Sequence, residues 1–378
     1  MGKPLDIVIR GDGIIGCTLA LALAPMGLRM GLVAGPAQAS LQEDVRAYSL
    51  NAAARQLLER LGAWPDAAHV GPVKRMAVWG DAGGEISFEA TAGQALSWMV
   101  EVRALEALLR ERAHALPQLS WLTEPVEAEL TAICEGRASQ TRRNCGVPFE
   151  RQPYPQHALA FRVRHGAAHQ GCARQWFSGK GDQAAILALL PMADPHQSSV
   201  VWSLPANWAL AHQQSNAADL EAALGQATGH ALGEMHLSSE RALWPLQSAQ
   251  ARHWCGEWAG GQRFVLVGDA AHNIHPLAGL GLNLGMDDVK ALVEVLAQRR
   301  PIGRQSGVGA WALLRQYERR RKLGASPVNA VCDGLQLLFA HPSELARWAR
   351  NTGLSGVDRL GFLKQWVMAR ATHLEPGA

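Results

Sequence analysis

The sequence contains none of the signals of an exported, disulfide-linked or membrane-spanning protein. No stretch reaches the roughly 18 consecutive apolar residues that a spanning helix needs, and no charged leader with an apolar core precedes the first strand-like segment. The six cysteines form no CxxC pair and no metal-like grouping with histidine: Cys17, Cys134, Cys145, Cys172, Cys255 and Cys332. We therefore expect reduced thiols, no metal, and a cytoplasmic protein whose only contact with the inner membrane is peripheral.

Charge is also scarce. Charged residues make up 18% of the 378 residues and the formal net charge is +3, so no nucleic-acid footprint is present. The densest basic group, Arg315 and Arg319 to Lys322, has helical spacing, which is typical of a solvated helix face, a ligand patch being the alternative. Hydrophobic residues make up 48%, and no internal repeat or low-complexity tract occurs. The length favours two folding units.

The first segment has the pattern of a β-α-β unit. A strand at Leu5 to Ile9 leads into a helix from about Ile15 to Met26, and a second strand follows at Met30 to Val33. Between strand and helix lies a GxGxxG motif. In such a motif Gly11 permits the tight turn, Gly13 lets a pyrophosphate approach the backbone, and Gly16 lets helix pack on strand. The alternative is a glycine turn in an unrelated α/β protein.

The usual acidic partner of that motif is not where we expect it. An acidic residue at the end of the second strand normally hydrogen-bonds the adenosine ribose. Here the strand ends Leu32-Val33-Ala34-Gly35, and Glu43 and Asp44 come too late to be a confident substitute. The adenosine end of the site is weakened or held by other groups.

The rest of the chain alternates between helical and strand patterns. Helices are expected at Ala52 to Leu61 and Val102 to Leu116, with a hairpin at Val73 to Val78 and Glu85 to Phe88 between them. The pattern from about Ala158 to Trp202 indicates a β-rich layer. After a helix at Leu220 to Gln226 and a strand at Phe264 to Val267, we expect helices around Met286 to Arg299, Trp311 to Lys322 and Val328 to Phe339.

A second motif occupies residues 268–285. A strand ends in Gly268-Asp269, a glycine-rich loop follows, and a helix begins near Asn283. Asp269 could accept hydrogen bonds from a polyol chain, and backbone N–H groups at the helix start could face an electron-poor ring edge. This combination suits the ribityl chain and the isoalloxazine ring of a flavin. A turn or helix cap is the structural alternative for Asp269.

With both motifs in view, the chain resembles the ubiquinone-biosynthesis hydroxylase branch of the class A FAD-dependent aromatic monooxygenases, the 2-polyprenylphenol hydroxylases among them. Further stretches match the same branch: Arg46-Ala47-Tyr48-Ser49-Leu50-Asn51, Arg174-Gln175-Trp176-Phe177, Trp244-Pro245-Leu246 and Asp333-Gly334-Leu335-Gln336. The likeness spans nearly the whole chain.

The resemblance implies a p-hydroxybenzoate hydroxylase-like α/β fold: a Rossmann-type FAD-binding domain, an inserted β-rich substrate layer and a helical C-terminus. We expect residues 1–72, 100–145 and 250–300 to form the FAD-binding domain, 73–99 and 146–249 the substrate domain, and 301–378 the C-terminal helical region. It also implies these cofactor-binding residues: Gly11, Gly13, Gly16, Arg46, Arg103, Asp269, Pro276, Gly279, Gly281, Leu282 and Asn283. For Arg46 and Arg103 an ordinary surface or ion-paired arginine is the alternative.

The activity implied is hydroxylation of the aromatic ring of a polyprenylated phenol. In the family NAD(P)H reduces FAD, O2 adds to the reduced ring, and the terminal oxygen of the C4a-hydroperoxide passes to the phenol. A dry pocket is needed, and no acid–base triad is expected. Trp176, Phe177 and Trp202 line that pocket or belong to the core, and His272 and His275 contact ligands or fix the loop. A complex with other ubiquinone-pathway proteins follows by family analogy.

The sequence departs from the family pattern at four places, all in segments that concern the cofactor or the reductant. Ala34 is not acidic, Leu280 stands where glutamine is common, and Glu135 replaces the aspartate of an Asp-Gly motif that handles FAD and NAD(P)H. The segment Leu119 to Ile133 is too short for the hairpin that relatives carry there, which would leave a sheet edge to be covered or paired. A non-catalytic partner protein with weakened FAD binding is therefore a second hypothesis, and a reductase or oxidase without hydroxylation a third.

Overall fold

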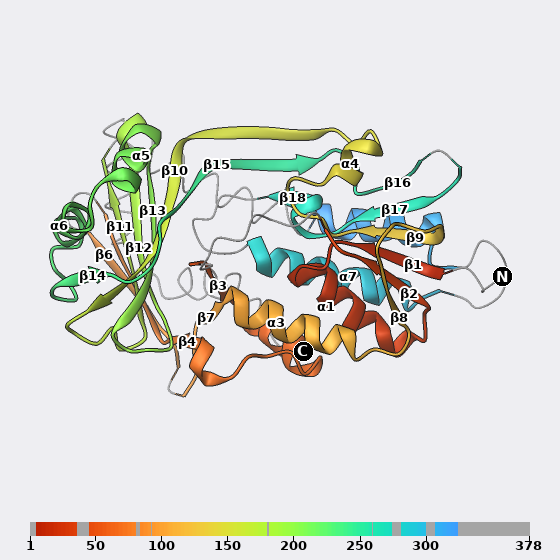
Figure 1. The fold of residues 1–378 in the computed structure, drawn as a ribbon, viewed down its shortest axis with the longest axis horizontal. Helices are drawn as coiled ribbons and strands as arrows, with labels where there is room; N and C mark the ends of the chain where they lie inside the picture. The colour runs from red at the N-terminus through yellow and green to blue at the C-terminus, as the bar shows by residue number, and fades with distance from the viewer. Residues whose placement is uncertain are drawn as a thin grey trace.

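Two lobes joined by a pair of long strands make up the protein. The computed structural model describes residues 5–35, 45–80, 84–91, 93–179, 181–258, 260–273, 281–299 and 307–323. Figure 1 shows the six-stranded sheet with its helices at one end and the larger, mainly antiparallel sheet at the other, with β10 and β15 running between them.

The six-stranded sheet is the core of the first lobe. Its strands follow the order β16 (Cys255–Glu257), β17 (Arg263–Leu266), β9 (Ala128–Ile133), β1 (Leu5–Arg10), β2 (Met30–Val33) and β8 (Leu119–Leu122). All neighbours are parallel except β16 and β17. Strands of a parallel sheet covered on both faces are apolar throughout, and Ile7, Val8 and Ile9 of β1 are indeed at most 1% exposed.

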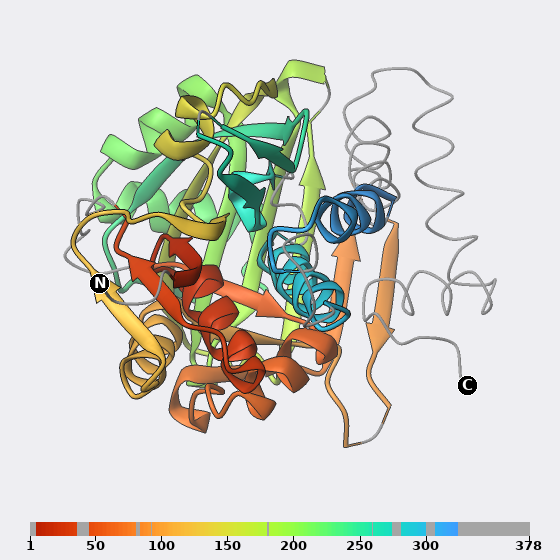
Figure 2. The same cartoon turned by 90° about the vertical axis from the view of Figure 1, so that its right-hand side faces the viewer.

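Helices cover this sheet. They are α1 (Ile14–Leu23), α3 (Val102–His114), α7 (Gly281–Leu296), the shorter α2 (Ala52–Arg60) and α4 (Gln140–Asn144), and a helix over residues 311–323. Helix α1 packs against both α3 and α7, and Figure 2 shows the blue helix of residues 311–323 beside α7. The helix expected at 15–26 ends at Leu23 and continues as a 3₁₀ turn over Ala24–Met26, since Pro25 has no N–H to donate. The helix expected at 328–339 lies outside the described residues.

The second lobe is a twisted, mainly antiparallel sheet. Its order is β18 (His272–Asn273), β15 (Ala242–Ala251), β10 (Phe149–His165), β13 (Gln197–Pro205), β12 (Ala185–Pro191), β11 (Cys172–Ser178), β5 (Arg75–Trp79) and β6 (Glu85–Glu89), and β14 (Met235–Leu237) also pairs with β10. Helices α5 (Ala206–Gln214) and α6 (Ala217–Thr228) pack on it and close a second core around Phe161. The expected β-rich layer is therefore present.

A small third sheet lies between the two lobes (Figure 1). It consists of β3 (Ala47–Leu50), β4 (Val70–Val73) and β7 (Ser97–Glu101), and β7 is its middle strand. The domain division given above stays our proposal. Strand β7 crosses its boundary between residues 99 and 100, and β18, within residues 250–300, pairs with β15 of the nine-stranded sheet.

The shortened segment 119–133 forms two strands of the first sheet. Residues 123–127 alone join β8, at one edge, to β9, on the far side of β2 and β1. The six Cα steps from Leu122 to Ala128 reach at most about 20–22 Å. The link has to cross three strand spacings, about 14 Å, and also run back about five residues, about 16 Å, because Leu122 is level with Arg10 and Ala128 with Leu5; it is therefore close to fully extended. Strand β9 pairs with β1 and with β17, whereas β8 pairs with β2 alone and is an edge strand of the described sheet.

Candidate functional site

The glycine turn after β1 has the geometry expected of a dinucleotide-binding loop. Gly11 has φ +109°, and a Cβ there would lie 2.6 Å from the carbonyl oxygen of Cys134. A Cβ on Gly16 would lie 1.8 Å from the Gly11 oxygen, whereas nothing lies within 4 Å of a Cβ on Gly13. Two glycines are thus required for close packing inside the protein. The third leaves open space on the outer side of the turn.

Helix α1 starts at this open space without a capping side chain. Gly13 is its N-cap residue, no side chain accepts a hydrogen bond from the first turn, and no acidic residue occurs in that turn. The first N–H groups of a helix need an acceptor, and the positive end of the helix dipole favours an anion. A pyrophosphate at Gly13 satisfies both requirements.

Asp269 lies in the 3₁₀ turn Gly268–Ala270 and is an exposed residue of the described structure, although protein atoms lie close around its carboxyl group. Burial raises the pKa of its carboxyl group, against the opposing charges of His272, Arg137 and Arg46. A carboxylate that is reached by water but enclosed by protein can accept hydrogen bonds from the hydroxyl groups of a ligand.

The two motifs meet at one side chain. A Cβ on Gly268 would lie 3.2 Å from Ile15 Cγ1, and one on Gly285 of α7 would lie 2.7 Å from Ile15 Cδ1. Ile15 belongs to the first turn of α1, so segments about 250 residues apart in sequence are in contact at the start of two helices. The parts of the predicted flavin site are therefore assembled in one place.

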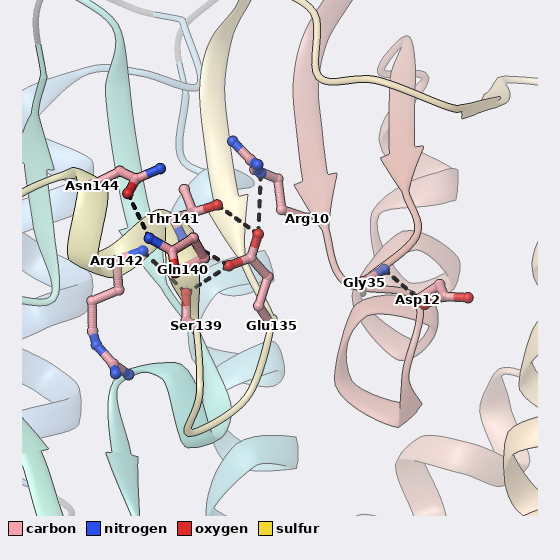
Figure 3. A network of polar contacts seen from close by, with 9 residues as sticks. All are labelled: Arg10, Asp12, Gly35, Glu135, Ser139, Gln140, Thr141, Arg142 and Asn144. Carbon is pink, nitrogen blue, oxygen red and sulfur yellow. Dashed lines mark hydrogen bonds and ion pairs between the residues drawn. The ribbon is translucent and has the colours of Figure 1, made fainter. Parts of the chain in front are cut away.

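Glu135 occupies the position of the family's aspartate and is fully hydrogen-bonded. Its carboxylate accepts from Ser139 Oγ at 2.7 Å and from Thr141 N at 3.0 Å and Oγ1 at 2.5 Å, and it pairs with Arg10 Nε at 3.2 Å. Figure 3 shows it between Arg10 and α4. Burial alone would raise the pKa of Glu135, but the hydrogen bonds from Thr141 and Ser139 and the charge of Arg10 hold it below its usual value. The longer side chain is thus accommodated as a carboxylate.

Arg142 is a functional candidate that sequence inspection did not single out. It is 0% exposed and donates to the carbonyl oxygens of Ala270 and Arg137, each at 3.0 Å, with its guanidinium 3.6 Å from the ring centre of Phe149. Burial and the charges of Arg151 and Arg143 lower its pKa to about 10, so it is still a cation at neutral pH. It connects the Glu135 motif to the loop of Asp269, and only its place in the same motif could have indicated this.

A buried charge cluster holds the Gly268 loop from the other side. Asp288 of α7 is 0% exposed and accepts from Gly268 N at 2.9 Å, His272 Nε2 at 2.7 Å and Arg321 Nε at 2.5 Å. Burial would raise the pKa of Asp288, but His272 and Arg321 hold it below its usual value. His272 also stacks on Trp254, with ring centres 4.8 Å apart. In the described residues His272 therefore fixes the loop; His275 lies outside them.

The other predicted residues have different surroundings. Arg46 is half-buried, and its charge acts on Asp269. Asn283 is buried and uses its side chain within the protein, accepting from Asn51 N at 2.9 Å and donating to the Ser49 oxygen at 2.7 Å. Gly281 and Leu282 begin α7, with open space beside Gly281. Arg103 lies exposed in the first turn of α3. Pro276, Gly279 and Leu280 lie outside the described residues.

The aromatic residues considered for the substrate pocket have different surroundings. Trp202 is 6% exposed, belongs to the second core and stacks on His212, which agrees with the structural alternative. Trp176 is half-buried and stacks on Trp79 with ring centres 5.0 Å apart. Neither contact involves the glycine turn or the Asp269 loop.

Comparison with known proteins also indicates a flavin-binding hydroxylase. A family model described as "FAD binding domain" matches residues 122–330. The chain is 30% identical to ubiquinone hydroxylase UbiL of Rhodospirillum rubrum over 98% of its length and 90% of that protein. It is 29% identical to 3-demethoxyubiquinol 3-hydroxylase of Escherichia coli over 98% of its own length and 99% of that protein. The chain belongs to the FAD-dependent aromatic hydroxylases of ubiquinone biosynthesis.

Solved structures confirm the fold class. The monooxygenase PqsL of Pseudomonas aeruginosa superposes with a TM-score of 0.71 at 21% identity, over 94% of this chain and all of that one. p-Nitrophenol 4-monooxygenase PnpA of Pseudomonas putida gives 0.74 at 15% identity, over 98% and 99%. These neighbours confirm the expected Rossmann-type domain with an inserted β-rich layer. The family model and the named relatives confirm the FAD cofactor and the class of enzyme, and NAD(P)H is the reductant typical of the family.

The described residues fit FAD. No described residue lies within 4 Å of a Cβ on Gly13, the helix that starts there has no side-chain cap, and Asp269 offers an exposed carboxylate to ligand hydroxyl groups. The described cysteines, all except Cys332, are free thiols, and burial raises the pKa of Cys17 to about 12, which makes it unreactive near the turn. Within the described ranges no helix is long and apolar enough to cross a membrane.

Proposed function

We propose that this protein hydroxylates the aromatic ring of a polyprenylated phenol on the way to ubiquinone, with O2 and NAD(P)H as co-substrates. The observation that carries the proposal is the meeting of the glycine turn, the Asp269 loop and the start of α7 at Ile15, which builds one flavin site from three distant segments. The named relatives act in ubiquinone synthesis, and this supports the choice of substrate class.

Each predicted residue has a defined task in the proposal. Gly11 and Gly16 shape the turn, and Gly13 with the start of α1 binds the pyrophosphate. Asp269 accepts from the ribityl hydroxyl groups, while Arg46 and Arg103 serve the phosphates or the surroundings of the ring. Gly281, Leu282 and Asn283 present backbone N–H groups to the pyrimidine edge, and Pro276 and Gly279 are the further cofactor-binding residues of the proposal. FAD supplies the redox and oxygen chemistry when bound.

The protein's own residues hold the cofactor loop, orient the phenol ring and exclude water from the reacting edge. Strand β18 ties the Asp269 loop to the nine-stranded sheet, with Asn273 opposite Ala249 and His272 opposite Gln250. The sheet that covers the substrate is therefore hydrogen-bonded to the loop that binds the cofactor. Fixing these two parts relative to each other places the phenol ring against the reacting edge and excludes water from it.

The test is a turnover experiment with purified holoprotein. With a short-chain polyprenylphenol, NAD(P)H and 18O2, we expect one labelled oxygen atom in the product and flavin bound at close to one per chain. NAD(P)H oxidation that yields only hydrogen peroxide with every phenol tried would refute hydroxylation in favour of a simple oxidase. A folded protein that stays colourless after incubation with excess FAD would refute catalysis and favour the non-catalytic hypothesis.

The polyprenyl tail gives the proposal a second part. A substrate with such a tail is dissolved in lipid, so the protein has to reach it from the membrane surface by peripheral contact, in a complex with other ubiquinone-pathway proteins. Co-sedimentation with liposomes, prepared with and without the phenol, tests the contact. Absence of the protein from both liposome pellets would contradict it.

A further inference from the structure

Strand β2 ends without an acidic residue, and the neighbouring turn supplies one. The strand ends at Val33, and the next two residues are Ala34 and Gly35. Asp12, the second residue of the glycine motif, accepts a hydrogen bond from Gly35 N with its Oδ1 at 3.1 Å. A Cβ built on Gly35 would lie 3.9 Å from this oxygen. The carboxylate of Asp12 therefore lies next to the end of β2, where a side chain from that strand would begin (Figure 3).

A second contact fixes the other carboxylate oxygen of Asp12, Oδ2. Arg110 of α3 approaches Asp12 Oδ2 with Nη2 at 2.7 Å, and the Asp12 side chain is 20% exposed. A carboxylate has about four acceptor positions. Among the described residues, Gly35 and Arg110 use one position on each oxygen, and two positions are left. Both oxygens are held by neighbours from different elements, and the carboxylate keeps capacity for two donors from a ligand.

The charge of Asp12 is compatible with a phosphate nearby because it is paired. An unpaired carboxylate in this turn would repel a pyrophosphate at Gly13, the next residue. The cation of Arg110 offsets it at hydrogen-bonding distance. The ion pair of Asp12 and Arg110 carries no net charge. Two neighbouring hydroxyl groups of a ligand can donate to the two remaining acceptor positions, and they bring no charge that would have to be balanced.

We propose that Asp12 takes over the task of the missing acidic residue and accepts hydrogen bonds from the adenosine ribose hydroxyl groups of FAD, with Arg110 as its positioning residue. The inference rests on FAD occupying the glycine turn. It explains how the Ala34 departure is tolerated: the carboxylate reaches the same space from the turn after β1 instead of from β2.

The experiment compares two ligands on the apoprotein. FAD and its analogue that lacks the adenosine 2′-hydroxyl group are titrated by flavin fluorescence quenching, which needs no turnover. Because a hydrogen bond to a charged group is lost, we expect the unmodified protein to bind the analogue about 10-fold or more weakly. Equal affinity for the two ligands would overturn the proposal without any mutation. Binding of neither ligand would overturn both this inference and the proposed function.

Variants locate the effect. In Asp12→Asn the two ligands should bind within about 2-fold of each other, because the charge that favours the hydroxyl group is gone. Glu43→Gln, the matched control at the other acidic candidate, should keep the full difference. Arg110→Gln should weaken both ligands and shrink the difference only in part, since it positions the carboxylate. Loss of the difference in Glu43→Gln but not in Asp12→Asn would overturn the assignment.

Discussion

The buried ion cluster at Asp288 allows a quantitative test of how the cofactor loop is held. Asp288 is 0% exposed, and its substitution by alanine leaves the guanidinium of Arg321 buried with only the Leu284 oxygen, 3.2 Å from Nη2. Removing one partner of a buried ion pair costs about 3–5 kcal/mol. It also removes the acceptor of Gly268 N and of His272. We expect Asp288→Ala to lower the free energy of unfolding by that amount and to weaken FAD binding.

The same two helices provide a matched control. Glu294 of α7 pairs with Arg320 at 2.6 Å, and the two side chains are 39% and 50% exposed. An exposed pair of this kind contributes about 0–1 kcal/mol. Glu294→Ala therefore changes an acidic residue on the same helix, facing the same partner helix, and should have a small effect on stability and none on FAD binding.

Urea denaturation of the apoprotein, followed by circular dichroism, measures the difference. If burial of an unpaired cation causes the loss, the double variant Asp288→Ala, Arg321→Met should recover part of it, because the stranded charge is removed. The reasoning is refuted if Asp288→Ala and Glu294→Ala cost the same, or if the double variant loses the full sum of both single changes.

Three further outcomes can be checked. Gly16→Ala should destabilise the fold by at least about 1–3 kcal/mol because its Cβ would meet the Gly11 oxygen at 1.8 Å, whereas Gly13→Ala should fold normally and bind FAD more weakly; equal melting temperatures would contradict this. The pKa of Glu135 is lowered by folding, so its stabilisation is present above the unfolded value of about 4.3 and is lost as the pH falls through the lower folded value. In Glu135→Gln the fall in stability between about pH 5 and 3 should be shallower, and an unchanged slope would count against the network. Arg142→Met should retain helices and sheets by circular dichroism but lose FAD affinity, since the link to Ala270 is broken; unchanged affinity would show that the link is dispensable.

Local patterns predicted the parts of the fold that depend on neighbouring residues. The β-α-β unit was predictable because an apolar strand, a glycine turn and an apolar helix follow one another, and the turn requires glycine at Gly11 and Gly16 for steric reasons. Of the long strand β10, the sequence pattern indicates only the part after about Ala158, because Pro153 and Pro155 interrupt the apolar alternation before it, where the pairing with β15 also shifts between Pro153 and His157.

Contacts between distant segments were not predictable in the same way. Asp12 and Arg110 are 98 positions apart, and Asp288 and Arg321 are 33 apart on separate helices. Each residue taken alone resembles a surface charge. Packing of α1 against α3 brings the glycine turn with Asp12 to Arg110, and the contact of α7 with the helix of residues 311–323 brings Asp288 to Arg321. The Gly-Asp loop could be located from its sequence, but the cations that surround Asp269 could not.

Two of the departures from the family pattern are accommodated from the same strand. Arg10 and Asp12 flank Gly11 at the end of β1, which lies between β9 and β2. Arg10 pairs with Glu135, just after β9, and Asp12 accepts from Gly35, just after β2, so the two side chains act on opposite sides of the strand (Figure 3). Residues two apart in a regular strand would share one face, and it is the φ of +109° at Gly11 that separates them. The turn that admits the pyrophosphate therefore also directs one cation toward the Glu135 motif and one carboxylate toward the end of β2, which ties both compensations to the glycine that the cofactor itself requires.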